Sequence, residues 1–114
     1  TFAACSSDPT PVVACGGTGV ISVVSNLCPG DTAALVRAAE AGDYPTARAL
    51  QTKLGALSRT LFATSNPIPV KEGMSLLGLC GPGLRLPLVS EPKVAESMKV
   101  AMAAYGGLLG EQWR

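Results

Sequence analysis

The sequence predicts an α/β protein in which one buried strand precedes a series of helices, while the rest of the sheet lies outside the chain. Residues 20–24 (VISVV) are rich in β-branched side chains and alternate little, a pattern typical of a strand covered on both faces. Residues 45–63 carry apolar side chains at spacings of three and four, which predicts an amphipathic helix. Because one strand cannot form a stable sheet by itself, we expect neighbouring strands to be supplied from elsewhere.

The composition supports the same expectation. The chain has 114 residues, of which 47% are hydrophobic and 15% are charged. A typical soluble domain carries about 25% charged residues, so this chain has less polar surface than a self-sufficient domain of its size needs. A small compact helical protein is one explanation. We favour the other, a piece whose faces are covered by further chain or by partner subunits.

Charge and hydropathy exclude several classes of partner. Nine basic and eight acidic residues give a net charge of +1 without a basic block, so we expect no nucleic acid partner. No stretch approaches about 18 uninterrupted apolar residues, and no strongly charged amphipathic segment suits a membrane surface, so we expect no membrane association. Arg37 is the first basic residue, so the start of the chain has no basic segment of a secretory signal. These absences predict a cytoplasmic protein.

The sequence offers no metal-ligand pattern. Its four cysteines contain no CxxC pair, and it has no histidine. Two disulfides would use the even number of cysteines, but the chain is not small and loop-rich as disulfide-stapled secreted domains are. We therefore expect no metal and no cofactor. The cysteines are interpreted as buried, reduced thiols: Cys5, Cys15, Cys28 and Cys80.

The segment before the strand is expected to form turns rather than a helix. Pro9 and Pro11 leave little room for a helix before Gly16. Residues 16–19 (GGTG) have the composition of a phosphate-binding loop, but such a loop follows a strand and opens a helix. Here the glycines come before the strand, so we interpret them as a tight turn.

Four helices are predicted after the strand. Asp31 is expected to cap the first helix, and Asp43 to start the second. The third begins near Pro69 and the fourth carries Pro92 in its first turn, where proline is favoured. The predicted helices span residues 32–41, 45–63, 69–77 and 90–105, and the glycines expected to follow three of them are Gly42, Gly78 and Gly106. Their apolar sides are predicted at Ala47, Leu50, Leu54, Leu57 and Leu61, at Met74, Leu76 and Leu77, and at Val94, Met98, Ala101, Met102 and Tyr105.

Four short motifs carry a resemblance to a known enzyme family: residues 16–23 (GGTGVISV), 66–71 (NPIPVK), 77–79 (LGL) and 84–88 (LRLPL). The sequence around them resembles the C-terminal region of dihydrodipicolinate synthases, which belong to the lyase family that includes N-acetylneuraminate lyase. The similarity runs from Gly16 to the end and covers less than half of a family member, whose (β/α)8 barrel needs about 250 residues. The resemblance implies the C-terminal fragment of such a TIM barrel. Its last one or two βα units would lie in residues 1–41, and a C-terminal helical region in residues 42–114.

The resemblance also implies the chemistry of a class I aldolase. In the family, a lysine at the end of an earlier barrel strand forms a Schiff base with pyruvate, and a tyrosine relays protons. The resulting enamine attacks an aldehyde, which is aspartate semialdehyde in the synthases of lysine biosynthesis. Such a lysine must be partly desolvated so that its pKa falls. None of the four lysines of this chain is expected at the end of a strand. We therefore assign no catalytic residue to it and expect the segment alone to be inactive.

Three positions are expected, by resemblance, to contribute to the pyruvate pocket. Ile21 matches a last-strand position whose backbone lines that pocket. Ser7 and Asp8 stand where the family has a Gly-Asp-Asp turn, although the connection that follows is shorter here than in the family. A solvated turn carboxylate is the alternative for Asp8. Arg85 is interpreted as a structural cation that bonds helix-end carbonyls or a neighbouring subunit.

Two other functions stay open. One is a different lyase of the family, similar to N-acetylneuraminate lyase, although the NPIPVK and LRLPL motifs favour the synthase. The other is a non-enzymatic helical interaction module that docks through residues 45–63, but such a module has no reason to keep an apolar strand unpaired. The enzyme hypothesis implies pyruvate as the substrate of the parent protein. It also implies the remainder of the barrel and further copies, in a homo-oligomer, as partners.

Overall fold

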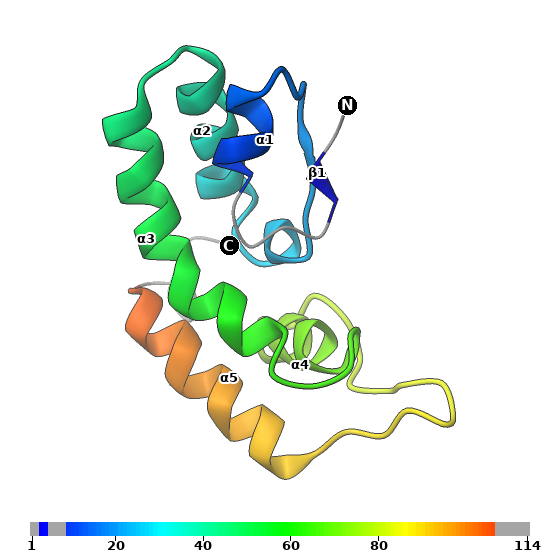
Figure 1. Cartoon of the computed structure of the whole chain (residues 1–114). Coiled ribbons are helices and arrows are strands. Elements are labelled where there is room, and N and C mark those ends of the chain that lie inside the picture. Colours follow the sequence, from blue (N-terminus) through cyan, green and yellow to red (C-terminus); the bar gives the residue numbers. More distant parts are fainter. Residues whose placement is uncertain (1–2, 5–8, 107–114) are drawn as a thin grey trace. The chain divides into compact units, whose positions relative to one another are not determined.

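The structure is a computed structural model that describes residues 3–4 and 9–106 (Figure 1). Most of the described chain is helical. The elements, in order, are β1 (Ala3–Ala4), α1 (Thr10–Ala14), β2 (Val20–Ile21), a short 3-10 helix η1 (Val24–Asn26), α2 (Pro29–Glu40), α3 (Tyr44–Leu61), α4 (Ile68–Leu76) and α5 (Pro92–Tyr105). They form two compact units, Thr1–Gly55 and Ala56–Arg114, and the boundary between the units falls within α3.

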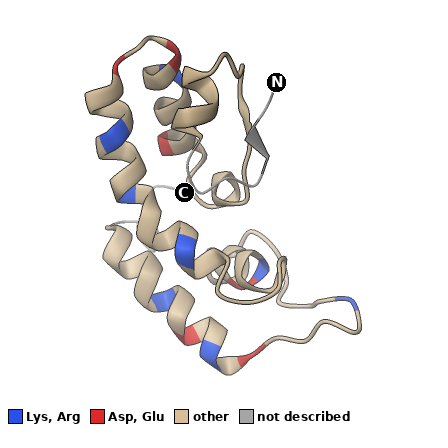
Figure 2. Cartoon of the chain, viewed as in Figure 1, with Lys and Arg blue, Asp and Glu red and all other residues tan. Residues whose placement is uncertain are grey.

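Charged residues of both signs are interspersed along three of the helices. Figure 2 shows Lys or Arg together with Asp or Glu on α2, α4 and α5, whereas the charged side chains within α3 are basic. Within residues 3–4 and 9–106, no helix combines the length and the apolar character that crossing a bilayer requires.

The first unit is built around a parallel pair of strands. β1 and β2 pair in parallel, with Ala3 opposite Val20 and Ala4 opposite Ile21. Two parallel strands that follow each other in the chain need a crossover connection, and α1 lies within that connection. α1 packs against α2, and η1 also packs against α2. The order of elements is therefore strand, helix, strand, helix.

α1 corrects the expectation that residues before Gly16 form no helix. Its first turn accommodates Pro11, because the amides of a first turn have no partner within the helix and the missing N–H is no loss. The amide of Val13 donates to the carbonyl oxygen of Pro9 at 3.1 Å, and the amide of Gly17 donates to that of Val12 at 2.8 Å. The second proline thus lies in the first turn of a short helix instead of preventing one.

The predicted strand over residues 20–24 is much shorter than expected. Only Val20–Ile21 pair as a strand, and the chain then turns into η1. The Ser25 hydroxyl donates a hydrogen bond to the carbonyl oxygen of Ser22 at 2.6 Å. Such local bonds offer the backbone an alternative to a strand ladder. The apolar side chains of Val23 and Val24 are still buried, but Val24 lies in η1 and Val23 directly precedes it.

α2 begins before the predicted residue 32, and Asp31 is not its cap. The helix starts at Pro29, with Cys28 in the capping position and no side-chain capping bond. Asp31 lies in the first turn, where its Oδ2 accepts a hydrogen bond from Lys53 Nζ at 2.6 Å. A carboxylate in this position interacts favourably with the positive end of the helix dipole. The acidic residue at the start of the helix therefore stabilises it by a different route than predicted.

α3 confirms its prediction closely. Four of the five predicted apolar positions, Ala47, Leu54, Leu57 and Leu61, are buried. Asp43 precedes the helix, and its Oδ1 accepts a hydrogen bond from the amide of Thr46 at 3.2 Å. Hydrogen bonds from the Thr46 side chain, and then from its backbone, lower the pKa of the exposed Asp43 carboxyl below its ordinary value.

In the second unit, α4 packs against α5. α5 buries Met98 and Met102 completely, on the side predicted for it. α4 differs from its prediction, since its first turns are buried while the predicted apolar positions are only half-buried. The buried residues are Ile68, Pro69, Val70 and Gly73, and the half-buried ones are Met74, Leu76 and Leu77. Gly78 and Gly106 have φ of +73° and +79°, which is the left-handed conformation expected where these helices end.

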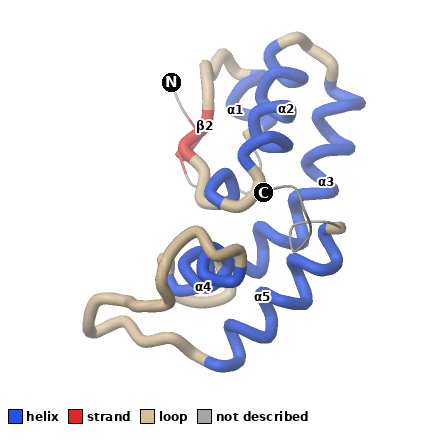
Figure 3. Tube along the Cα trace, turned by 180° about the vertical axis from the view of Figure 1, so that it is seen from behind, coloured by secondary structure: helices blue, strands red, loops and turns tan. Residues whose placement is uncertain are grey.

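A long loop over residues 77–91 joins α4 to α5 and is seen in Figure 3 as the tan segment between them. Two contacts made by side chains of the loop tie it to α4. The Cys80 thiol donates to the carbonyl oxygen of Lys71 at 3.8 Å, and the Ser90 hydroxyl donates to Glu72 Oε2 at 3.0 Å. Between these contacts most residues of the loop are exposed, with Leu84 and Leu88 half-buried, and Leu86 retains 85% of its accessible surface.

Candidate functional site

The carboxyl end of β2 is the first place to look for a functional site. Ligands of parallel α/β folds bind at the carboxyl ends of the strands, and β1 and β2 are parallel, so their carboxyl ends lie at one edge. Ile21 is the last residue of β2, and 64% of its surface is exposed. In the described part of the chain it is therefore not covered on both faces, contrary to the sequence-based expectation. Its contribution to a pyruvate pocket stays a prediction.

Ser7 and Asp8 lie outside the described residues. Their predicted contribution to the same pocket also stays a prediction.

The four lysines of the sequence all lie on helices. Lys53 on α3 is paired with Asp31, and Lys71 on α4 is half-buried. Lys93 and Lys99 are exposed on α5. A lysine that forms a Schiff base needs partial removal from water. Lys53 is ion-paired and Lys93 and Lys99 are exposed, so Lys71 is the one lysine of the four that is partly removed from water, and it lies within α4 rather than at the end of a strand.

The thiols of the described chain differ in environment. Cys28 is buried, as expected for all of them, but Cys80 is half-buried and Cys15 is exposed. Cys5 lies outside the described residues. Within the part of the chain that the structure describes, no three His, Cys, Asp or Glu side chains come together as a metal site.

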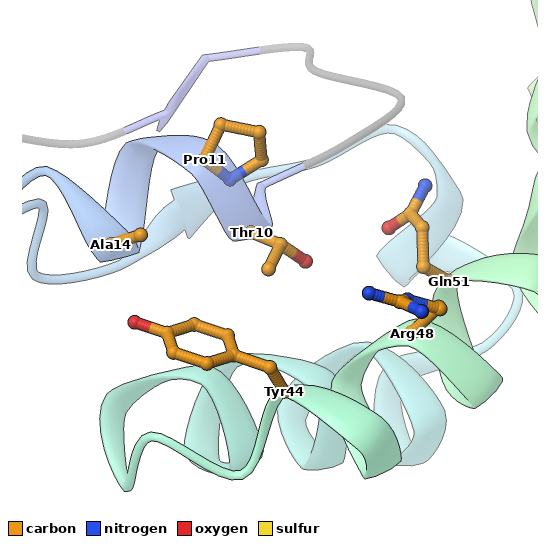
Figure 4. A pocket seen from close by; sticks show the side chains of 6 residues that line it. All are labelled: Thr10, Pro11, Ala14, Tyr44, Arg48 and Gln51. Atoms are coloured by element: carbon orange, nitrogen blue, oxygen red, sulfur yellow. The ribbon is translucent and has the colours of Figure 1, made fainter.

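At least two cavities lined by described residues lie in the first unit, and neither of these two includes Ile21. The larger, of about 450 Å³, lies between the region of β2 and one side of α2; Val20, Ser25, Pro29, Thr32, Ala33, Val36 and Arg37 line it. The smaller, of about 300 Å³, lies between α1 and the first half of α3 (Figure 4); Thr10, Pro11, Ala14, Tyr44, Arg48 and Gln51 line it.

The sequence analysis does not predict the smaller cavity. Tyr44, Arg48 and Gln51 are spaced by four and three residues, so they share one side of α3. That spacing is a usable signal, but its partner α1 was predicted to be a turn. Without α1 there is no second wall.

The comparison with protein families supports the resemblance of the sequence motifs. Residues 7–104 match the model of the Dihydrodipicolinate synthetase family. The 4-hydroxy-tetrahydrodipicolinate synthase of Syntrophotalea carbinolica is 43% identical over 97 residues, which cover 84% of this chain and 33% of the relative. The synthase of Thermomicrobium roseum is 46% identical over 95 residues, which cover 82% of this chain and 32% of that relative. The chain thus spans about a third of the length of these curated relatives.

Solved structures share the backbone arrangement. The crystal structure of dihydrodipicolinate synthase from Aquifex aeolicus superposes with a TM-score of 0.84 at 38% identity, over 87% of this chain and 34% of that one. The chloride-inhibited dihydrodipicolinate synthase from Acinetobacter baumannii, complexed with pyruvate, gives a TM-score of 0.87 at 31% identity. The superposition covers 92% of this chain and 36% of that one. Sequence and backbone agree over most of the chain, and we conclude that it belongs to the Dihydrodipicolinate synthetase family.

Proposed function

We propose that the chain is the C-terminal third of a pyruvate-dependent Schiff-base lyase, which condenses pyruvate with aspartate semialdehyde in lysine biosynthesis. The observation that carries the proposal is the identity of 43% with a 4-hydroxy-tetrahydrodipicolinate synthase over 84% of this chain. A solved relative that superposes on 92% of the chain was crystallised with pyruvate, which supports the same substrate here.

The architecture of the first unit supports a place at the end of a (β/α)8 barrel. A parallel strand pair with a crossover helix is the repeating unit of such barrels, and β1, α1, β2 and α2 follow that order. Residues 1–41 would supply the last two βα units, and residues 42–114 the helical region that follows the barrel. In a closed barrel, further strands would pair on the outer edges of β1 and β2 and would cover Ile21.

The chemistry would be divided between this chain and the rest of the enzyme. The Schiff-base lysine and the proton-relaying tyrosine would come from the preceding part of the barrel. This chain would supply the Ile21 backbone, together with Ser7 and Asp8, to the wall of the pyruvate pocket. The complete enzyme would act in the cytoplasm as a homo-oligomer.

A graft tests the proposal. Residues 7–104 replace the matching third of the Aquifex aeolicus synthase, and the chimera is treated with pyruvate and borohydride and then analysed by intact mass and peptide mapping. We expect a reduced adduct on a lysine of the Aquifex part, together with condensation of pyruvate with aspartate semialdehyde. The 114-residue chain alone should give no adduct. An adduct on one of its own four lysines, or a folded chimera that traps no pyruvate, would contradict the proposal.

Two matched substitutions test the position of β2 in a barrel. Ile21 and Val100 are similarly exposed apolar residues, at 64% and 62%. In the chimera, Ile21→Asp should abolish folding, because a charge taken out of water costs several kcal/mol, whereas Val100→Asp on α5 should be tolerated. In the isolated chain both changes should have similar, small effects. Equal tolerance of the two changes in the chimera would refute the barrel position of Ile21.

A further inference from the structure

We propose that the cavity between α1 and the first half of α3 binds a small organic monocarboxylate with a flat apolar body. This site is separate from the carboxyl end of β2, so the proposal does not depend on the lyase chemistry. All six lining residues belong to the first unit.

The cavity has two unlike walls. α1 contributes Pro11 and Ala14, which are small apolar groups, and Thr10, whose side chain points toward α3 in Figure 4. α3 contributes the ring of Tyr44, which lies opposite Thr10, and the side chains of Arg48 and Gln51 at the other end. A volume of about 300 Å³ is at the lower end of the range for small-molecule pockets.

Among the described residues, the charge in the cavity has no ion-pair partner. Arg48 is the only charged residue among the six that line it. Within residues 3–4 and 9–106, no carboxylate lies within ion-pair distance of its guanidinium, while Lys53, five residues further along α3, is paired with Asp31. A guanidinium binds a carboxylate through two parallel N–H···O bonds. The arrangement therefore favours an anion with a planar acidic group.

The apolar part of the cavity lining favours a ligand whose carboxylate is attached to a flat apolar group. The rings of Tyr44 and Pro11 and the methyl group of Ala14 present apolar area to the cavity. An aromatic ring gains from offset or edge-to-face contact with another ring. A ligand that places its carboxylate on Arg48 and its ring against Tyr44 would use both ends of the cavity. Benzoate is the simplest molecule with this chemistry, and benzamide is its neutral counterpart of the same shape.

The test is a titration of the ¹⁵N-labelled 114-residue chain with benzoate at low ionic strength, followed by amide chemical shifts. We expect saturable shifts confined to α1 and the first half of α3, with a Kd on the order of 1 mM. Arg48→Gln should raise this Kd about tenfold, since it removes the charge-assisted bonds. Arg59→Gln is the matched control, because Arg59 is an exposed arginine of the same helix that does not line the cavity.

Benzamide separates recognition of the carboxylate from burial of the ring. It should bind the unaltered chain and the Arg48→Gln variant with the same weak affinity. Benzoate and benzamide of equal affinity, an equal loss in Arg59→Gln, or shifts outside α1 and α3 would each overturn the proposal. Binding of benzoate to the Aquifex chimera, measured by equilibrium dialysis, tests the same site in a complete enzyme. Absence of benzoate binding to the chimera would also overturn the proposal.

Discussion

Truncation of Met102 measures how much of the stability of the second unit comes from the packing of α5. Met102 has 0% exposure, and Met102→Ala removes three heavy atoms from a fully buried position. At about 0.8 kcal/mol for each buried methylene-sized group, the transfer term alone is about 2.4 kcal/mol. The cavity that remains places the total within the range of about 2–5 kcal/mol found for such truncations. For a chain of this size, a loss of about 2.4 kcal/mol lowers Tm by on the order of 10–20 °C.

The assay is thermal unfolding of both proteins, followed by circular dichroism at one protein concentration. Val100→Ala is the control on the same helix, since Val100 is 62% exposed and exposed substitutions usually change stability by no more than about 0.5 kcal/mol. If Met102→Ala and Val100→Ala lowered Tm equally, the burial of Met102 would not contribute to stability, and the account of α5 would be wrong.

Three further changes test local features of the first unit. Asp43→Asn keeps a capping side chain at the start of α3 but cannot ionise. Because the folded-state pKa of Asp43 is lowered, ionisation of its carboxyl stabilises the folded chain at pH values above the ordinary carboxyl pKa. This stabilisation is lost as the pH falls through the lowered pKa. In unfolding curves measured at decreasing pH, the difference in stability between the unaltered chain and Asp43→Asn should therefore shrink. A double-mutant cycle with Asp31→Ala and Lys53→Ala should give a coupling of about 0.2–1 kcal/mol in urea unfolding, since both groups are partly solvated, and no coupling in high salt. Gly17→Ala should destabilise the turn after α1, because an added Cβ would lie 2.7 Å from the carbonyl oxygen of Val12; unchanged urea unfolding would show that this turn relaxes freely.

The helices were largely predictable because their signals are local. The stripe on α3 and the methionines of α5 recur with the helical period, and burial follows the same residues. α1 was missed because Pro9 and Pro11 suggest interruption, and only the structure shows which proline falls in the first turn. The early start of α2 has a similar cause, since Pro29 suits a first turn as well as the turn that precedes a helix.

The length of a strand and the lining of a site depend on contacts with residues distant in the sequence, which a local sequence pattern does not reveal. Residues 20–24 have the composition of a strand, but pairing decides its length, and in the described chain β2 pairs only with β1. The family resemblance could be recognised from the motifs, whereas the cavity at Arg48 needed two helices separated by about thirty residues of chain. The residues that resemblance assigned to pyruvate, Ile21, Ser7 and Asp8, are untested by the geometry.

The exposed loop between α4 and α5 has a consequence for the integrity of the second unit. A protease of tryptic specificity would find the Arg85–Leu86 bond accessible, as both residues are exposed. Cleavage there would sever the polypeptide while the contact of α4 with α5, and the anchoring of the loop at Cys80 and Ser90, remained. The two products would stay associated as a nicked protein, held by non-covalent packing alone.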